Sequence, residues 1–324
     1  MSKKNILEYK VIKKVTGIYG FSSLLPLLAI VLFLSIFTKN FLAPDNIMQV
    51  LRQASVYAIM AVGMTFVLIT GGTDLSQGSS LALCCVTGCL TINATGNMWL
   101  GILVSVLTGA VVGTLNGAVI AYVKIPPFIM TLGSMYMVRG FTLYITNSTQ
   151  VSVKHDYFKF LGQGFIGGIP VPVYIFLFVG LVAHIILNHT TTGRYICAIG
   201  SNEATSKLSG VKVEKNLIKA YVISGICVGM AAVVYLSRLS AAQPTAGQSY
   251  EMEAIAATVI GGTSVSGGEG GIFGTLIGAI IIAVIRNGLV LLGVGSFFTQ
   301  IVLGLIIVGA VSLDVSRRRM AVNK

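Results

Sequence analysis

Seven ionisable side chains lie inside or beside long apolar stretches and are the first candidates for chemistry. A charge in apolar surroundings is costly, so such a residue is a candidate functional position. The seven are Asp74, Arg139, Arg238, Glu251, Glu253, Glu269 and Arg286. Asp74 and Glu269 both lie in glycine-rich breaks, where irregular backbone can line a water-filled path. The structural alternative is that they cap helices or pack loops, and that charges at helix ends reach the surface.

The patterns of a nucleotide-binding or metal-dependent enzyme are missing from the sequence. No lysine follows a glycine loop with the Walker A spacing, and Gly267–Gly274 does not fit the dinucleotide-binding pattern. The three histidines have no partner pattern for metal binding or nucleophilic catalysis. Cys84, Cys85 and Cys89 lack histidine or carboxylate neighbours, which favours packing over metal binding. We therefore expect no catalytic residue, no metal site and no cofactor bound by this chain.

The composition is that of an integral membrane protein. Hydrophobic residues make up 55% of the 324 residues and charged residues only 10%, whereas soluble domains carry about 25% charged residues. The chain can hold roughly ten spans of about 20 residues. The apolar run Ile18–Phe37 exceeds the usual length in a signal peptide, so we expect it to be retained as a span. The predicted fold is an all-α polytopic membrane protein.

Turn residues and charges divide the apolar sequence into spans. Asn93–Asn97 interrupts the uncharged run 75–123, and Lys124–Pro127 ends it because proline removes a donor and clashes with the preceding turn. Ala254–Ile260 is too short to span unaided, and we expect a broken or re-entrant segment there. The other predicted spans are 15–38, 53–70, 128–145, 171–187, 220–239, 272–292 and 297–313, with a turn at 41–46 and an external loop at 146–171.

Fourteen of the 22 lysines and arginines lie in three places: the leader 1–18, the segment 191–219 and the tail 314–324. Six predicted crossings precede the central segment and four follow it, so all three places lie on one side. The positive-inside rule makes that side cytoplasmic. The net charge of +12 therefore needs no nucleic acid to explain it.

The central segment 191–219 contains the signals of one short helix. Ser201 and Asn202 form an N-cap pair, and Gly210 is a C-terminal stop. The expected helix has about eight residues and is therefore marginal in isolation. Glu203 and Lys207 have the spacing of an i,i+4 ion pair.

The same helix carries a narrow apolar stripe made of Ala204, Leu208 and Val211. Its chemistry suits a helix that docks into a groove on a soluble partner. The alternative is a plain connector on the membrane surface.

An internal similarity links two glycine-rich stretches. Gly109–Val123 and Gly270–Val284 share eight of fifteen residues, and Val62–Met64 is echoed at Val228–Met230. Glycine at every fourth position clears a helix face for close packing. These glycines are Gly109, Gly113, Gly117, Gly270, Gly274 and Gly278. The offset of five spans predicts an inverted repeat, a common plan in transporters, although chance alignment of glycine-rich spans is the alternative.

Short motifs are spread over most of the chain. They are Gly71–Ser79, Asn116–Gly117, Lys124–Gly133, Arg139–Gly140, Gly193–Arg194, Ala198–Ala204, Ser209–Val211, Tyr250–Ala257 and Gly261–Gly270. Through them the chain resembles the permease subunits of bacterial ABC sugar importers, the family of the ribose, xylose, methyl-galactoside and autoinducer-2 permeases. Thr73 and Gln77 depart from the apolar residues that are usual in the first motif.

The resemblance implies a single transmembrane domain, 1–324, in the bacterial inner membrane that forms a path for a ribose-like monosaccharide. It implies a second permease copy or paralogue and a periplasmic sugar-binding protein. It also implies a cytoplasmic ATPase pair that binds ATP and Mg in place of this chain.

In such importers a coupling helix enters a cleft of the ATPase, and Arg194–Gly210 matches its position. The coupling candidates are Arg194, Asn202, Glu203, Ala204, Lys207, Leu208 and Gly210. The candidates for the translocation path are Asp74, Asn116, Phe128 and Glu269.

Two alternatives stay open at this point. An ABC permease for a nucleoside or an amino acid would share the same architecture. A secondary transporter without an ATPase would also show an inverted repeat and broken helices, but it would want a coherent set of intramembrane carboxylates, which this sequence lacks.

Overall fold

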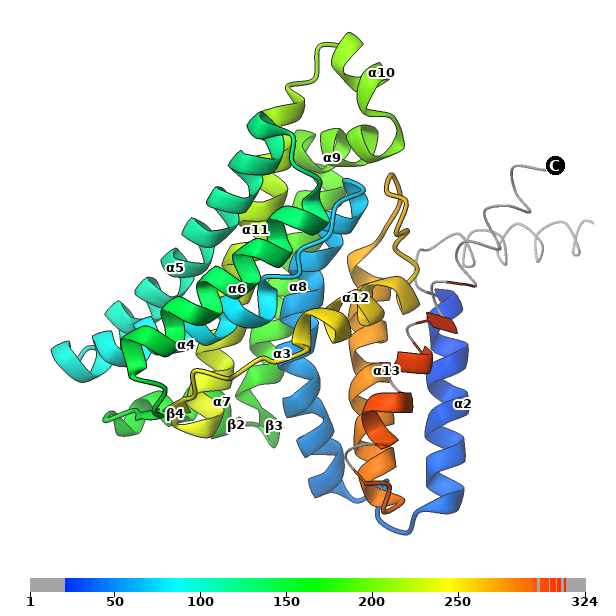
Figure 1. The fold of residues 1–324 in the computed structure, drawn as a ribbon. Coiled ribbons are helices and arrows are strands. Elements are labelled where there is room, and N and C mark those ends of the chain that lie inside the picture. The colour runs from blue at the N-terminus through cyan, green and yellow to red at the C-terminus, as the bar shows by residue number, and fades with distance from the viewer. Residues whose placement is uncertain (1–20, 296–297, 303, 307, 310–311, 313–324) are drawn as a thin grey trace, which may run out of the picture.

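A computed structural model describes residues 21–295, 298–302, 304–306, 308–309 and 312, and shows a bundle of long helices (Figure 1). Within these residues, seven helices are long and apolar enough to cross a membrane. They are α3 (Pro44–Ile69), α4 (Gln77–Thr95), α5 (Met98–Ala118, continued by the π-helical turn η1, Val119–Val123), α6 (Pro127–Thr146), α8 (Val171–His189), α11 (Val213–Leu239) and α13 (Ile272–Leu291). The apolar helix α2 (Phe21–Phe37) is shorter.

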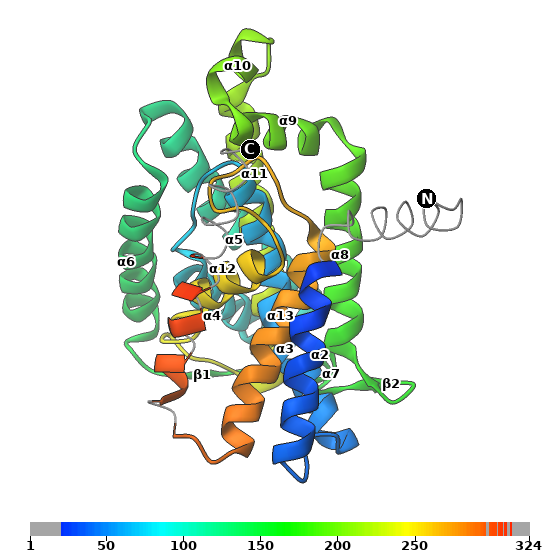
Figure 2. The same cartoon turned by 90° about the vertical axis from the view of Figure 1, so that its right-hand side faces the viewer.

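Helix α3 forms the centre of the bundle. Every residue from 54 to 69 is buried, and α11, α13, α12 and α8 pack around it. Figure 2 shows it enclosed by these helices. Polar side chains inside this stretch bond within the helix, as when the Thr65 hydroxyl donates to the Ala61 carbonyl at 2.8 Å. An apolar helix without a solvent face is expected in such a position.

Two helices begin earlier in the chain than predicted. Helix α3 begins at Pro44 instead of Gln53, because proline is well suited to the first helical position and Asp45 follows in the first turn. Helix α11 begins at Val213 instead of Ala220. Its extra turns carry charged residues on one face and bury Val213 and Asn216 on the other. The predicted turn at 41–46 therefore ends at residue 43, and the polar segment 191–219 is largely helical.

The predicted breaks between spans are confirmed. Helix α4 ends at Gly96, whose φ of 66° is left-handed, and the Asn97 side chain accepts hydrogen bonds from the amides of Trp99 and Leu100 at the start of α5. The turn η1 ends at Lys124, also left-handed, just before the two prolines.

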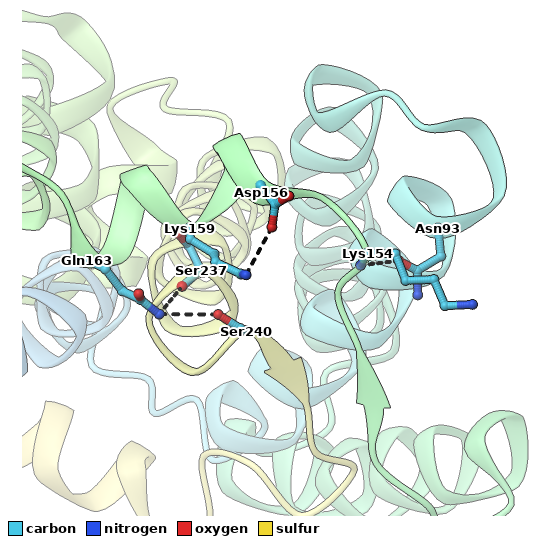
Figure 3. Close-up of polar contacts among 7 residues, drawn as sticks. All are labelled: Asn93, Lys154, Asp156, Lys159, Gln163, Ser237 and Ser240. Carbon is cyan, nitrogen blue, oxygen red and sulfur yellow. Dashed lines mark hydrogen bonds and ion pairs between the residues drawn. The ribbon is translucent and has the colours of Figure 1, made fainter.

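The predicted external loop between α6 and α8 is tied down by polar contacts (Figure 3). Strand β1 (Val151–Ser152) pairs antiparallel with β4 (Ala241–Ala242). Two short helices follow, η2 (Asp156–Lys159) and α7 (Phe160–Gln163), and then the hairpin of β2 (Phe165–Ile166) and β3 (Ile169–Pro170). The Asn93 side chain accepts from the Lys154 amide at 2.8 Å, and Gln163 donates to Ser240 at 3.2 Å.

Helix α12 (Tyr250–Ile260) has only 11 residues, which is too short to cross a bilayer alone. This confirms that the segment is too short to span unaided, while a broken or re-entrant path through the membrane stays a prediction. The helix lies near mid-height in the bundle (Figures 1 and 2) and packs on α13 and α3. The predicted last span, 297–313, lies partly outside the described residues, and the leader 1–18 and the tail 314–324 lie wholly outside them.

The glycines of α5 lie directly against α11. A Cβ atom added at Gly113 would overlap the backbone of Tyr221, and one at Gly109 would overlap that of Gly225. In the second stretch Gly278 faces Ala257 of α12, whereas Gly270 precedes α13 and lies beside Thr263. The six glycines therefore do not form two equivalent helical stripes, since α13 begins only at Ile272.

Replacing Gly113 by leucine is expected to lower the melting temperature of the detergent-solubilised protein clearly. The side chain must displace α11, and overpacking of this kind destabilises by about 1–3 kcal/mol. The matched control is Gly133→Leu on α6, where an added Cβ meets no atom within 4 Å. Equal melting temperatures for the two variants would contradict the close α5–α11 contact.

Candidate functional site

The polar segment between α8 and α11 contains two helices instead of one. Helix α9 (Thr191–Ser201) begins at a Thr190 cap and was not predicted. It buries Gly193, Ile196 and Ile199, and Arg194 is exposed in its first turn. Helix α9 therefore packs on the bundle and carries the next helix at its end.

The second helix is α10 (Glu203–Leu208), which has six residues instead of the expected eight. Its predicted cap is confirmed, since the Asn202 side chain accepts from the Thr205 amide at 2.9 Å. Gly210 has a left-handed φ of 81°, and its amide donates to the Lys207 carbonyl at 3.0 Å. The helix is shorter because Ser201 still belongs to α9 and Ser209 is already the C-cap.

The predicted ion pair between the side chains of Glu203 and Lys207 is not among the ion pairs of the described residues. Lys207 Nζ instead lies 4.0 Å from Oε1 of Glu214, at the start of α11. Such exposed pairs contribute about 1 kcal/mol or less. The features that α10 presents to a partner are therefore its shape and its apolar edge, not an internal ion pair.

Helix α10 projects from one end of the bundle (Figures 1 and 2). Of its residues only Ser206 is buried, whereas Ala204 is exposed and Leu208 is 90% exposed. Ala204 and Leu208 thus form an exposed apolar edge on a protruding, otherwise polar segment. The geometry is that of a helix presented for docking.

The end of α9 lies against two glycine loops, the first made of residues 70–76 and the second of residues 261–271. A Cβ added at Gly200 would overlap the backbone oxygen of Ile69, next to the first glycine loop. The same oxygen accepts a hydrogen bond from the Gly268 amide of the second glycine loop at 2.8 Å. Only a glycine at position 200 allows these three backbone segments to meet.

A cavity of about 300 Å³ separates α10 from the first glycine loop. Glu203 and Glu214 line it from the side of α10 and α11, and Lys124 and Gly72 line it from the opposite side. Tyr221 also lines it and donates from its hydroxyl to the Thr73 carbonyl at 3.2 Å. The start of α10 and the loop that carries Asp74 therefore line the same cavity.

Asp74 is the centre of a buried hydrogen-bond cluster. Its Oδ1 accepts from the Ser76 hydroxyl at 2.6 Å and from the Ser76 amide at 3.1 Å, and its Oδ2 accepts from Ser224 of α11 at 3.0 Å. Asn116 of α5 donates to the Ser76 hydroxyl at 2.9 Å, and Gln77 donates to Ser224 at 2.9 Å. The carboxylate therefore joins the first glycine loop to α5 and α11.

The other predicted path residues are not brought into this cluster. Phe128 is 56% exposed at the start of α6. Glu269 is exposed in the second glycine loop, where its carbonyl accepts from the Ser264 amide at 3.0 Å. Of the four candidates, only Asp74 and Asn116 are close together, both in contact with Ser76.

Sequence comparison identifies the architecture. The profile of the family described as "Branched-chain amino acid transport system / permease component" matches residues 46–311. The chain belongs to the permease subunits of bacterial ABC importers. This permease is 43% identical to the ribose import permease protein RbsC of Escherichia coli over 299 residues, which cover 90% of this chain and 92% of the relative.

More distant relatives extend the same similarity. The permease is 38% identical to the D-allose transport system permease protein AlsC of Escherichia coli, with 88% of each chain covered. It is 36% identical to the galactose/methyl galactoside import permease protein MglC of Escherichia coli, with 97% of each chain covered. No solved structure matches. As a multi-pass permease component it is not itself catalytic, and ATP is bound by a separate ATPase subunit.

Several residues of the site were not singled out from the sequence of the permease. Ser224 pairs with Asp74 across 150 positions, and nothing local marks it. Arg139, by contrast, was singled out from the sequence, but its partners were not: its guanidinium donates to the carbonyls of Pro244 and Ala246 at 2.6 and 2.8 Å. Gly200 stood within a recognised motif, but its contact with Ile69 depends on packing that no local pattern contains.

Replacing Asp74 by alanine is expected to lower the free energy of unfolding of the permease by about 2–4 kcal/mol. The change leaves the buried hydroxyls of Ser76 and Ser224 without their acceptor, and each unsatisfied group costs about 1–3 kcal/mol. Thermal unfolding in detergent measures the effect, with Asp45→Ala at the exposed start of α3 as the control. A variant as stable as the control would instead favour a role for Asp74 on the path.

Proposed function

We propose that this permease forms the membrane path for a monosaccharide, with a ribose-like sugar as the first choice, delivered by a periplasmic binding protein. The observation that carries the proposal is the similarity to permeases named for ribose, D-allose and galactose, at 36–43% identity over at least 88% of the chain. The family description names branched-chain amino acids instead, so an amino acid is the second candidate cargo.

The proposed assembly contains two permease subunits, either two copies of this chain or this chain and a paralogue. A pair of cytoplasmic ATPase subunits contacts α10 of each permease, and the binding protein meets the opposite end of the bundle. The exposure of Leu208 and the capped, protruding form of α10 support this contact. Glu203, Ala204 and Lys207 lie on the same exposed helix, and Arg194 is exposed in the first turn of α9.

The proposed topology has ten spans, an inverted repeat and both termini in the cytoplasm, within one transmembrane domain. Under the repeat, α3 corresponds to α11 and α5 corresponds to α13. Helix α5 packs on α11, and α13 packs on α3. The repeat would map the first of these contacts onto the second, because it relates α5 to α13 and α11 to α3. The helix pairs α4–α5 and α12–α13 are likewise in contact.

Among the candidate path residues, Phe128 and Glu269 are accessible to a cargo, since both side chains are exposed. Asp74 and Asn116 are buried and do not contact the cargo; they hold α5, α11 and the first glycine loop together. This division assigns contact with cargo to the exposed pair and alignment of helices to the buried pair.

Uptake into proteoliposomes tests the proposal. The permease is reconstituted with its ATPase and binding protein, and uptake of radiolabelled ribose, galactose and leucine is measured with and without ATP. We expect ATP-dependent uptake of a monosaccharide and none of leucine. Uptake of leucine alone would overturn the sugar assignment, and uptake without ATP or the ATPase would indicate a secondary transporter.

A further inference from the structure

A polar cavity is lined by residues from the first half of α3 and the second half of α13. Figure 1 shows these parts of the two helices at the end of the bundle opposite α10. Its volume is about 390 Å³, within the range of about 300–1,000 Å³ of small-molecule sites. The binding protein of an importer would meet this end of the permease first. A cavity in this place is therefore positioned to receive cargo before it passes α12.

One face of α3 leads into the cavity with polar groups at regular helical spacing. Gln49, Gln53 and Tyr57 follow one another at intervals of four residues and all line the cavity, so they lie along one helix face. Gln49 is exposed, Gln53 is half-buried and Tyr57 is buried. The stripe therefore runs from the surface into the protein.

The side-chain amides of Gln49 and Gln53 make no hydrogen bond with the described residues. Each primary amide offers two donors and a carbonyl acceptor, which can serve vicinal hydroxyl groups of a sugar. Uncommitted amides at two successive turns of a helix favour a ligand with several hydroxyls over an apolar one.

The inner wall combines aromatic rings with a guanidinium group. The rings of Tyr57 and Tyr250 are 4.9 Å apart and nearly edge to face, and the Arg286 guanidinium lies 5.8 Å from the centre of the Tyr57 ring. Arg286 pairs with Glu253 of α12, yet its Nε has no hydrogen-bond partner among the described residues. Apolar ring faces near the side-chain amides of Gln49 and Gln53 suit the two surfaces of a pyranose or furanose ring.

The charge of the wall argues against a zwitterionic amino acid as the ligand. The described residues that line the cavity include Arg238 and Arg286 but no aspartate or glutamate. An ammonium group would therefore lack a carboxylate, and Glu253 is already paired with Arg286. A neutral polyol needs neither charge partner.

We infer that this cavity is a low-affinity receiving site for a neutral monosaccharide, in which Gln49 and Gln53 bind sugar hydroxyls and Tyr57 and Tyr250 support the ring. The inference rests on the proposed function and specifies where cargo first binds the permease. Tyr250 begins α12 and Glu253 follows in its first turn, so a sugar in this site lies next to the broken helix.

Protection from alkylation tests the site directly. Gln49→Cys in the complete importer, held in nanodiscs, is labelled with a membrane-impermeant maleimide with and without millimolar ribose. We expect ribose to slow labelling at least about threefold, and leucine to leave it unchanged. Gln150→Cys, an exposed position in the loop before β1, is the control and should not respond. Unaltered labelling of Gln49→Cys, or protection by leucine alone, would overturn the inference.

Uptake by a second variant separates this inference from the proposed function. Gln53→Leu is expected to lower ATP-driven ribose uptake about tenfold, while Gln150→Leu retains the wild-type rate. If the wild-type importer takes up no monosaccharide, the proposed function fails. If it takes up ribose and Gln53→Leu matches Gln150→Leu, the receiving site alone is wrong. Gln49→Leu, at the exposed mouth, repeats the comparison if Gln53→Leu does not fold.

Discussion

Replacing Gly200 by valine is expected to reduce ATP-driven uptake by at least tenfold. The side chain would overlap the backbone oxygen of Ile69, which also accepts the hydrogen bond from the Gly268 amide. Backbone atoms cannot rotate away as a flexible side chain can, so the end of α9 must move out from the two glycine loops. Uptake per amount of monodisperse importer, measured in proteoliposomes, gives the effect.

The control for this change is Gly140→Val on α6, where an added Cβ meets no atom within 4 Å. Gly200→Ala provides a smaller change at the same position if the valine variant does not fold, and it should also lose uptake. The ratio of ATP hydrolysed to sugar transported should rise in both Gly200 variants. Wild-type uptake by Gly200→Val would show that α9 does not need this contact.

Replacing Leu208 by aspartate is expected to weaken binding of the ATPase subunit by at least tenfold without unfolding the permease. The leucine is 90% exposed, so its replacement should change the free energy of unfolding by less than about 0.5 kcal/mol. If it fills a pocket on the ATPase, burying a carboxylate there costs about 2 kcal/mol or more. Affinity between the separately purified subunits in detergent measures the change.

Tyr157→Asp serves as the control, because Tyr157 is 81% exposed in η2, at the other end of the bundle. Gly210→Val approaches the same question through the backbone, since its left-handed φ of 81° disfavours a β-branched residue. It should uncouple ATP hydrolysis from uptake. Normal ATPase affinity in Leu208→Asp would exclude this edge of α10 from the contact.

The predictions for Gly200 and Leu208 depend on a continuous set of contacts between α10 and the membrane helices of the permease. Helix α10 follows α9, and Gly200 of α9 lies against the backbone of Gly268 in the second glycine loop and of Ile69. Ile69 directly precedes the first glycine loop, which carries Asp74. Asp74 then joins α5 and α11 through Ser76, Asn116 and Ser224. A displacement of α10 by the ATPase therefore has a contiguous path of backbone contacts and hydrogen bonds into the membrane helices.

The parts of the fold that depend on local chemistry were predictable. Asn97 and Asn202 cap helices with their own side chains, and Lys124 precedes two prolines, so breaks and caps could be read from short stretches. The start of α11 was missed because charged residues extend a helix beyond the membrane as readily as they end one. Helix α9 was missed because it has only 11 residues, and glycines and a charged residue interrupt its apolar positions in the sequence.

The site itself depends on contacts between distant residues. Asp74 was identifiable as a charge in a glycine-rich break, but its partner Ser224 lies on another helix. Gly200 was visible only as part of a motif, because its packing against Ile69 requires the assembled bundle. The stripe of Gln49, Gln53 and Tyr57 was within reach of sequence analysis, since its four-residue spacing needs no structure to detect.

Cross-linking from position 208 tests most directly whether α10 docks on the ATPase. Leu208→Cys carries a thiol-linked photoreactive group in the assembled importer, and Tyr157→Cys carries the same group as a control. The account predicts a covalent adduct between Leu208→Cys and the ATPase subunit, and none from Tyr157→Cys or from the labelled wild-type chain. No ATPase adduct from position 208, in an importer that still transports sugar with ATP, would contradict it.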